Sequence, residues 1–125
     1  MMGFVFYNPN PDGKYVGDCV IRAISRLLRQ DWDTTYYDIC ELGGDIHNMP
    51  SADDVWGEYL YRNGFRKHAI LDTCPFCYTI KDFCLDHPVG SFLLKTSGHV
   101  VAVVNGNYYD TSDSGNEVPI YFWGK

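Results

Sequence analysis

The chain has 125 residues, a formal net charge of −6 at pH 7, and a composition that is 46% hydrophobic and 16% aromatic. This length fits a single compact domain, residues 1–125, and the apolar content predicts a globular chain rather than a disordered one. The negative charge disfavours nucleic acid or an anionic membrane surface as the main partner.

At the N-terminus, MMGFVFYNPNPDGK lacks the basic segment and long apolar run of a secretory signal, and no later stretch has the length of a membrane span. Five cysteines without an export signal disfavour a disulfide framework. We therefore expect a reduced, cytoplasmic protein whose thiols serve packing, metal binding or chemistry.

The first elements are a short strand at GFVFY, a turn-rich loop, and a helix in YVGDCVIRAISRLL, residues 15–28. Apolar residues in this stretch follow helical spacing at Val20, Ala23, Ile24, Leu27 and Leu28. The arginines fall mostly on the other side, at Arg22, Arg26 and Arg29. Asp18 is the expected N-cap, which makes Cys19 the first helical residue.

Three further helices are predicted in DTTYYDICEL, SADDVWGEYLYRNG and TIKDFCLDHP. Each has a Ser or Thr followed three residues later by Asp, which is capping-box spacing: Thr35 with Asp38, Ser51 with Asp54, and Thr79 with Asp82. Glycine or proline is expected to end them, at Gly43–Gly44, Gly64 and Pro88.

After Gly90 the pattern changes to β-rich runs, SFLLKT, HVVAVV, NYYDT and VPIYFW, with a strong hairpin signal at VNGN. Helices first and strands later predict an α+β fold, in which N-terminal helices pack on a C-terminal antiparallel sheet.

Cys19 is a candidate nucleophile because of its place at a helix N-terminus. The positive end of the helix dipole and the free N–H groups there stabilise a thiolate and can polarise a substrate carbonyl. A lone cysteine at a helix start is more often a packing residue. Catalysis therefore also requires a base and a group that orients the base.

The base is expected among four histidines. His47 falls in a loop, His68 in a predicted strand, and His87 near the end of a short helix. His99 begins HVVAVV, where the rim of a sheet meets a loop and a side chain can project into a cleft.

The hairpin register connects His99 to an acid. With Asn105–Gly106 as a two-residue turn, Val101 pairs with Asp110. Because side chains alternate along a strand, His99 shares a face with Asp110 and lies diagonally across the hairpin from it, roughly 7 Å away at the backbone. Asp113, the rival acid, has the opposite parity. A bulged turn would shift this register.

GDCVIRAI opening a helix, followed by GHVVAVVNGNYYDT, resembles the papain-like cysteine peptidases, and most of all their compact bacterial and phage members related to bacteriocin-processing peptidases. The resemblance implies that the Cys opens a central helix on an antiparallel sheet that carries the His and its Asp or Asn partner. The order Cys19, His99, Asp110 matches. GDCVIRAIS is also similar to the Asp-Gly-x-Cys helix start of ovarian-tumour-type deubiquitinases, with Gly and Asp arranged differently.

The chain departs from this family at the oxyanion hole. Papain-like enzymes usually carry a Gln about six residues before the Cys, and here that position is Gly13. The backbone N–H of Cys19 is one expected donor, and the amide of Asn8, in preference to that of Asn10 between two prolines, is the expected second. If neither amide serves, the oxyanion hole is incomplete.

The remaining cysteines invite a metal hypothesis. Cys74, Cys77, Cys84 and His87 give C-x2-C-x6-C-x2-H, a set of four potential zinc ligands. The short inner loop and the helical spacing of Phe83, Cys84 and His87 favour packing instead, with two thiols in a loop and Cys84 in the core. Cys40, inside a predicted helix, is interpreted as core.

These patterns predict a cysteine hydrolase that cleaves a peptide, isopeptide or amide bond through Cys19, His99 and Asp110, with no cofactor and no bound metal. Acyl transfer would use the same residues. The expected partner is a peptide or protein substrate, with ubiquitin-like proteins as one candidate class. The alternative is an inactive papain-fold binding or regulatory module, with zinc at the Cys74, Cys77, Cys84 and His87 cluster.

Overall fold

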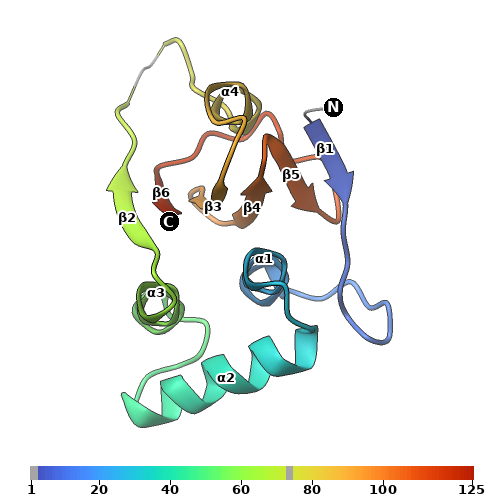
Figure 1. Cartoon of the computed structure of the whole chain (residues 1–125), viewed down its shortest axis with the longest axis vertical. Helices are drawn as coiled ribbons and strands as arrows, with labels where there is room; N and C mark the ends of the chain where they lie inside the picture. Colours follow the sequence, from blue (N-terminus) through green and yellow to red (C-terminus); the bar gives the residue numbers. More distant parts are fainter. Residues whose placement is uncertain (1–2, 73–74) are drawn as a thin grey trace.

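The computed structural model describes residues 3–72 and 75–125, and Figure 1 shows how they fold. In chain order the elements are β1 (Gly3–Phe6), α1 (Cys19–Leu28), α2 (Trp32–Asp45), α3 (Asp53–Arg62), β2 (Arg66–Ala69), α4 (Ile80–Asp86), β3 (Ser91–Lys95), β4 (Val100–Val104), β5 (Asn107–Asp110) and β6 (Tyr121–Gly124). Helices dominate the N-terminal part and strands the C-terminal part, so the predicted α+β fold is confirmed. Within these two ranges, none of the helices combines the length and the apolar composition needed to cross a bilayer.

The strands form one six-stranded sheet in the order β1-β5-β4-β3-β6-β2. β1 pairs with β5 in parallel, and all other neighbouring pairs are antiparallel. The sheet is thus mixed rather than antiparallel throughout. It also includes β1, which precedes α1, and β2, which lies between α3 and α4. β1 occupies the edge of β5 that the hairpin leaves unpaired, which provides hydrogen-bond partners for the backbone there.

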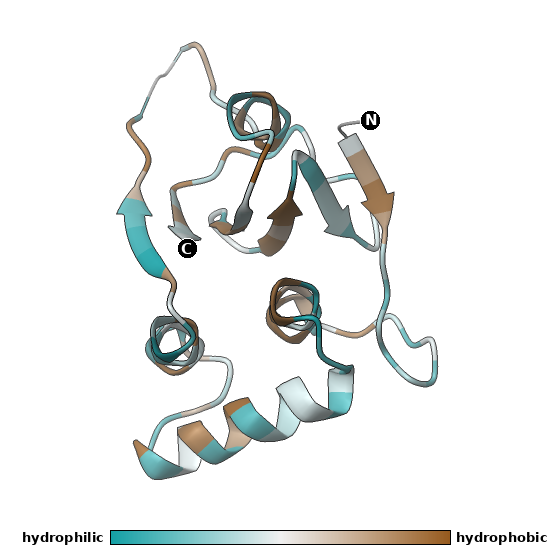
Figure 2. Cartoon of the chain, in the orientation of Figure 1, coloured by the Kyte–Doolittle hydropathy of each residue, from teal (hydrophilic) through white to brown (hydrophobic). Residues whose placement is uncertain are grey.

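Helices cover both faces of the sheet, with α1 on one side and α4 on the other (Figure 1). Even-numbered residues of β4 share one core cluster with α1: Val100, Ala102 and Val104 with Ala23, Ile24 and Leu27. Odd-numbered residues share a second cluster with α4: Val101 and Val103 with Ile80, Phe83 and Cys84. Figure 2 shows β4 as hydrophobic along its length between the two helices. Both faces of the central strand are therefore buried.

α2 differs from its prediction at both ends. Its N-cap is Asp31, whose side chain accepts the Thr34 N–H, so Thr35 is not the capping residue. The helix continues through Gly43–Gly44 instead of stopping there. A Cβ on Gly43 would lie 2.8 Å from the carbonyl oxygen of Asn48, so this glycine permits a close backbone approach rather than ending the helix.

The two later capping patterns have different outcomes. α3 begins after Ala52, which has no side-chain cap, so the Ser51 and Asp54 pattern is not used as a capping box. At α4, Thr79 and Asp82 form the reciprocal capping box that their spacing predicts.

The hairpin between β4 and β5 forms as predicted. Asn105 and Gly106 have φ angles of 50° and 79°, the left-handed values that a type I′ turn requires. The register is Ala102 with Tyr109, Val103 with Tyr108, and Val104 with Asn107. This pairing brings the residue before β4 beside the end of β5, and it is here that the candidate site lies.

Candidate active site

Cys19 is the first residue of α1, as predicted, and carries a free, half-buried thiol. Asp18 occupies the N-cap position, but its side chain makes no capping hydrogen bond. Helix geometry also leaves the first N–H groups of α1 without intrahelical acceptors. The start of α1 therefore combines a thiol with backbone donors that can bind a developing negative charge.

His99 lies immediately before β4, and its ring interacts with the Cys19 thiol strongly enough to lower the pKa of that thiol. The backbone N–H of Val100 also lowers the pKa of the Cys19 thiol. The rim of β4 thus stabilises the thiolate of Cys19 through one side chain and one backbone group. The structure brings together two residues that are 80 positions apart in the sequence.

Asp110, the last residue of β5, is the third residue of the site and contacts the His99 ring. Its Oδ2 lies 2.7 Å from Nε2 of His99, and its side chain is only 1% exposed. The Ser114 hydroxyl donates to the same oxygen at 2.7 Å, and the Thr111 N–H donates to Oδ1 at 2.7 Å. Because Nε2 is held by the carboxylate, Nδ1 is the ring nitrogen left for Cys19.

The predicted contact between His99 and Asp110 forms. Strand parity alone, however, does not explain how the His99 side chain comes close to Cys19. Odd-numbered residues of β4 face α4, whereas Cys19 belongs to α1 on the opposite face. His99 precedes β4 and Asp110 ends β5, so both lie at the rim of the sheet. At the rim, side chains can reach past the edge toward the start of α1.

The electrostatics favour a charged pair. Burial raises the pKa of the Cys19 thiol, but hydrogen bonds from His99 and Val100 and the positive charges of His99 and Arg22 outweigh it, and the pKa falls below its ordinary value. Hydrogen bonds to Asp110 and Cys19 raise the pKa of His99 to about 10. Burial opposes ionisation of Asp110, yet its hydrogen bond from His99 helps to lower that pKa to about 2. Both shifts favour a thiolate beside an imidazolium, compared with an isolated cysteine and histidine.

Arg22 is a site residue whose position the helical pattern predicts wrongly. The sequence puts it on the outer side of the helix, but the side chain is buried and bridges two carboxylates. It donates to Asp18 at 2.6 Å and to Asp110 at 3.0 Å, and Trp32 Nε1 donates to the other Asp18 oxygen at 2.9 Å. The i,i+4 spacing of Asp18 and Arg22 is the sequence signal that could have indicated the pair.

The asparagines proposed for the oxyanion hole form part of their own loop. The Asn8 side chain donates to the carbonyl of Lys14 at 3.2 Å and accepts the Asn10 N–H at 3.2 Å. The Asn10 side chain accepts the N–H groups of Asp12 and Lys14. Among the contacts of the described residues, none joins Asn8 to Cys19 or His99, so its donor role remains a prediction.

The possible zinc ligands do not converge where they are described. Cys74 lies outside the described residues. Cys77 is exposed, whereas Cys84 is buried in the core under β4, as expected. The His87 ring stacks on Phe83 at 3.8 Å between centroids. In the part of the chain that the structure describes, no group of three His, Cys, Asp or Glu side chains could hold a metal ion.

Cys40 differs from its expected place in the core. Its thiol is half-buried and lines a pocket between α1 and α2.

A thiol, an imidazole and a buried carboxylate in series can generate a thiolate and later return a proton to a leaving group. In comparisons with protein-family models, curated proteins and solved structures, none matches this chain.

Proposed function

We propose that the protein is a papain-like cysteine hydrolase that cleaves a peptide, isopeptide or amide bond. The observation that carries this proposal is the His99 ring, which is hydrogen-bonded to the buried Asp110 carboxylate and lowers the pKa of the Cys19 thiol. A core or packing cysteine needs no such partner. The placement of the thiol at a helix start, against the rim of a sheet that carries the base, supports the papain-like assignment.

The proposed reaction has two steps. The Cys19 thiolate attacks the carbonyl carbon, the carbon–nitrogen bond breaks, and the His99 imidazolium gives its proton to the departing amine, which leaves a thioester. Water then attacks the thioester carbonyl carbon while His99 accepts a proton from that water. The carbon–sulfur bond breaks, the carboxylic acid leaves, and Cys19 is again a thiolate beside the His99 imidazolium. An amine in place of water would give acyl transfer by the same route.

Asp110 and the start of α1 support these steps. Asp110 holds Nε2 of His99, which leaves Nδ1 as the ring nitrogen available to the Cys19 sulfur. The N–H of Cys19 is the proposed first oxyanion donor, and the Asn8 amide would have to leave its bond to Lys14 to become the second.

The test is the reactivity of individual thiols toward iodoacetamide at pH 7, measured by peptide mapping of the intact protein. Cys77 is exposed and free, and thus serves as an internal reference. We expect Cys19 to react at least about tenfold faster than Cys77, because a thiolate and not a thiol is the nucleophile. Replacement of His99 by Ala should remove this advantage. An inert Cys19 in the folded wild type would contradict the hydrolase and favour a binding module.

A further inference from the structure

Two buried carboxylates flank Cys19 and His99, and Arg22 binds both. Asp18 is the residue immediately before Cys19. Asp110 lies behind the His99 ring and binds its Nε2 at 2.7 Å. Arg22 donates to Asp18 at 2.6 Å and to Asp110 at 3.0 Å, and the side chains of all three are at most 6% exposed. The guanidinium thus joins the residue next to the nucleophile to the residue that holds the base.

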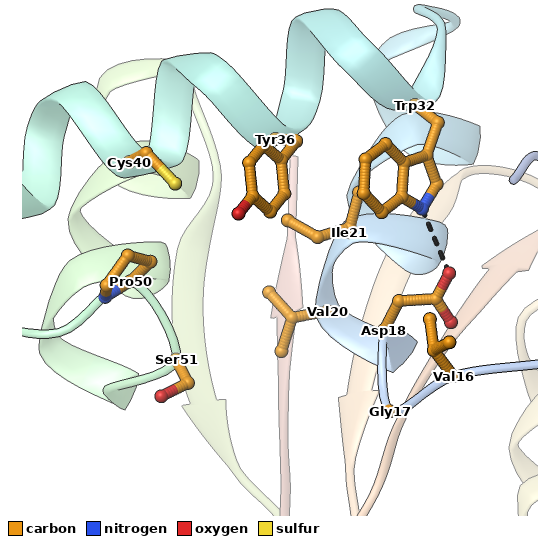
Figure 3. Close-up of a pocket in the computed structure, with 10 residues that line it drawn as sticks. All are labelled: Val16, Gly17, Asp18, Val20, Ile21, Trp32, Tyr36, Cys40, Pro50 and Ser51. Carbon is orange, nitrogen blue, oxygen red and sulfur yellow. Dashed lines mark hydrogen bonds between the residues drawn. The ribbon is translucent and has the colours of Figure 1, made fainter. Parts of the chain in front are cut away.

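Asp18 does not act as an ordinary N-cap. The side chain of an N-cap Asp normally accepts a backbone N–H from the first turn of its own helix. Here one carboxylate oxygen binds Arg22, and the other accepts the Trp32 indole N–H at 2.9 Å (Figure 3). A carboxylate that capped α1 would occupy N–H groups that can stabilise negative charge at Cys19. The bonds of Asp18 to Arg22 and Trp32 leave these donors uncapped.

The two oxygens of Asp110 have separate partners. Oδ1 accepts from Arg22 at 3.0 Å and from the Thr111 N–H at 2.7 Å. Oδ2 accepts from the Ser114 hydroxyl at 2.7 Å and is the oxygen that binds His99. Because Arg22 and Thr111 hold the first oxygen, rotation of the carboxylate is restricted and the second oxygen stays directed at His99.

The positive charge of Arg22 also acts on Cys19. Burial raises the pKa of this thiol, His99 and the Val100 N–H lower it, and the charge of Arg22 lowers it further. A lysine at position 22 would keep the charge but would lack the planar fork that binds two carboxylates at once. Arg22→Lys therefore separates the geometry of the bridge from its charge.

We propose that Arg22 is a positioning residue of the active site, which holds Asp18 away from the start of α1 and directs Asp110 at His99. The inference rests on the proposed hydrolase function and adds to it a residue that acts through two others. A purely structural bridge would stabilise the fold and leave the reactivity of Cys19 in the folded protein unchanged.

Arg22→Lys and its matched control Arg26→Lys test this role through alkylation of Cys19 by iodoacetamide from pH 4 to 10. Arg26 lies one turn further along α1, with its guanidinium over the Tyr109 ring and a hydrogen bond to the Tyr109 hydroxyl at 3.2 Å. On the rising part of the wild-type profile, we expect Arg22→Lys to lower the Cys19 rate about tenfold, since a hydrogen bond between charged groups is worth that factor. Arg26→Lys should keep the rate within about twofold of the wild type.

Cys84 reports whether each variant is folded, because its side chain lies in the core and is only 2% exposed. If Arg22→Lys makes Cys84 reactive without denaturant, Trp32→Phe replaces it as the test. This change preserves every charge and removes the indole N–H that holds Asp18. We expect it to lower the Cys19 rate about threefold, as for a neutral donor, with Tyr37→Phe on the exposed side of the same helix as its control.

The outcomes separate the two proposals. A wild-type Cys19 that reacts no faster than Cys77 at pH 7 contradicts the hydrolase, and the role of Arg22 with it. An activated Cys19 that keeps its rate in folded Arg22→Lys contradicts the positioning role alone. An equal loss in Arg26→Lys also contradicts it, and the same two results for Trp32→Phe and Tyr37→Phe do so where that pair is used.

Discussion

The state of Cys19 depends on a balance of opposed effects at single residues. Burial favours the neutral thiol, whereas His99, the Val100 N–H and the charge of Arg22 favour the thiolate. His99 is in turn held in its charged form mainly by Asp110. Because His99 is a major cause of the lowered pKa of Cys19, loss of His99 should move that pKa upward.

The pH dependence follows from these directions. Alkylation of Cys19 should rise with pH through a midpoint below the ordinary thiol value of 9.0 and then remain constant, since a thiolate is all that it requires. Hydrolysis should fall again near pH 10, where His99 loses the proton that the leaving amine needs. In His99→Ala the alkylation midpoint should move upward. Iodoacetamide rates from pH 4 to 10 check this, and an unchanged midpoint in the variant would contradict the assignment of the base.

Among the elements, α1 and the β4–β5 hairpin are joined by Arg22. The residue lies one turn after Cys19 and donates to Asp18 at the start of its own helix and to Asp110 at the end of β5. The guanidinium can bind two carboxylates at once because of its planar, forked geometry. Arg22 therefore positions Asp110 relative to the helix that carries the nucleophile.

Replacement of Arg22 by Met should leave two buried carboxylates without their shared partner and reduce the free energy of unfolding by about 3–5 kcal/mol. Arg62→Met is the matched control, because Arg62 pairs with Glu58 at 2.8 Å while their side chains are 58% and 40% exposed. That loss should stay below about 1 kcal/mol. Urea unfolding of both variants at pH 7 measures the difference, and equal losses would show that the buried bridge is not important for stability.

At the scale of the whole molecule, thiol reactivity reports on the fold. Cys19 owes its low pKa to tertiary contacts, whereas burial in the core raises the pKa of Cys84 to about 11. Unfolding removes both effects. With short pulses of iodoacetamide at pH 7 in increasing urea, we expect the Cys19 rate to fall and the Cys84 rate to rise in the same transition. A rise at both sites would mean that the fold does not activate Cys19.

Local sequence patterns were sufficient for much of the framework. The type I′ turn at Asn105–Gly106 determined the hairpin register, and with it the approach of His99 to Asp110, because strand pairing next to a two-residue turn leaves little freedom. The start of α1 at Cys19 and the capping box at Thr79 were also predictable, since both depend on neighbouring residues alone.

Contacts between distant segments were decided by the tertiary structure. The pairing of β1 with β5, the burial of Arg22 between Asp18 and Asp110, and the pocket that Cys40 lines all require elements from different parts of the chain to pack together. The sequence by itself determined which residues are chemically able to form the site and paired two of them. Only the packing of α1 on the sheet brought Cys19 to His99, because hydrophobic burial sets that placement and has no local spacing to reveal it.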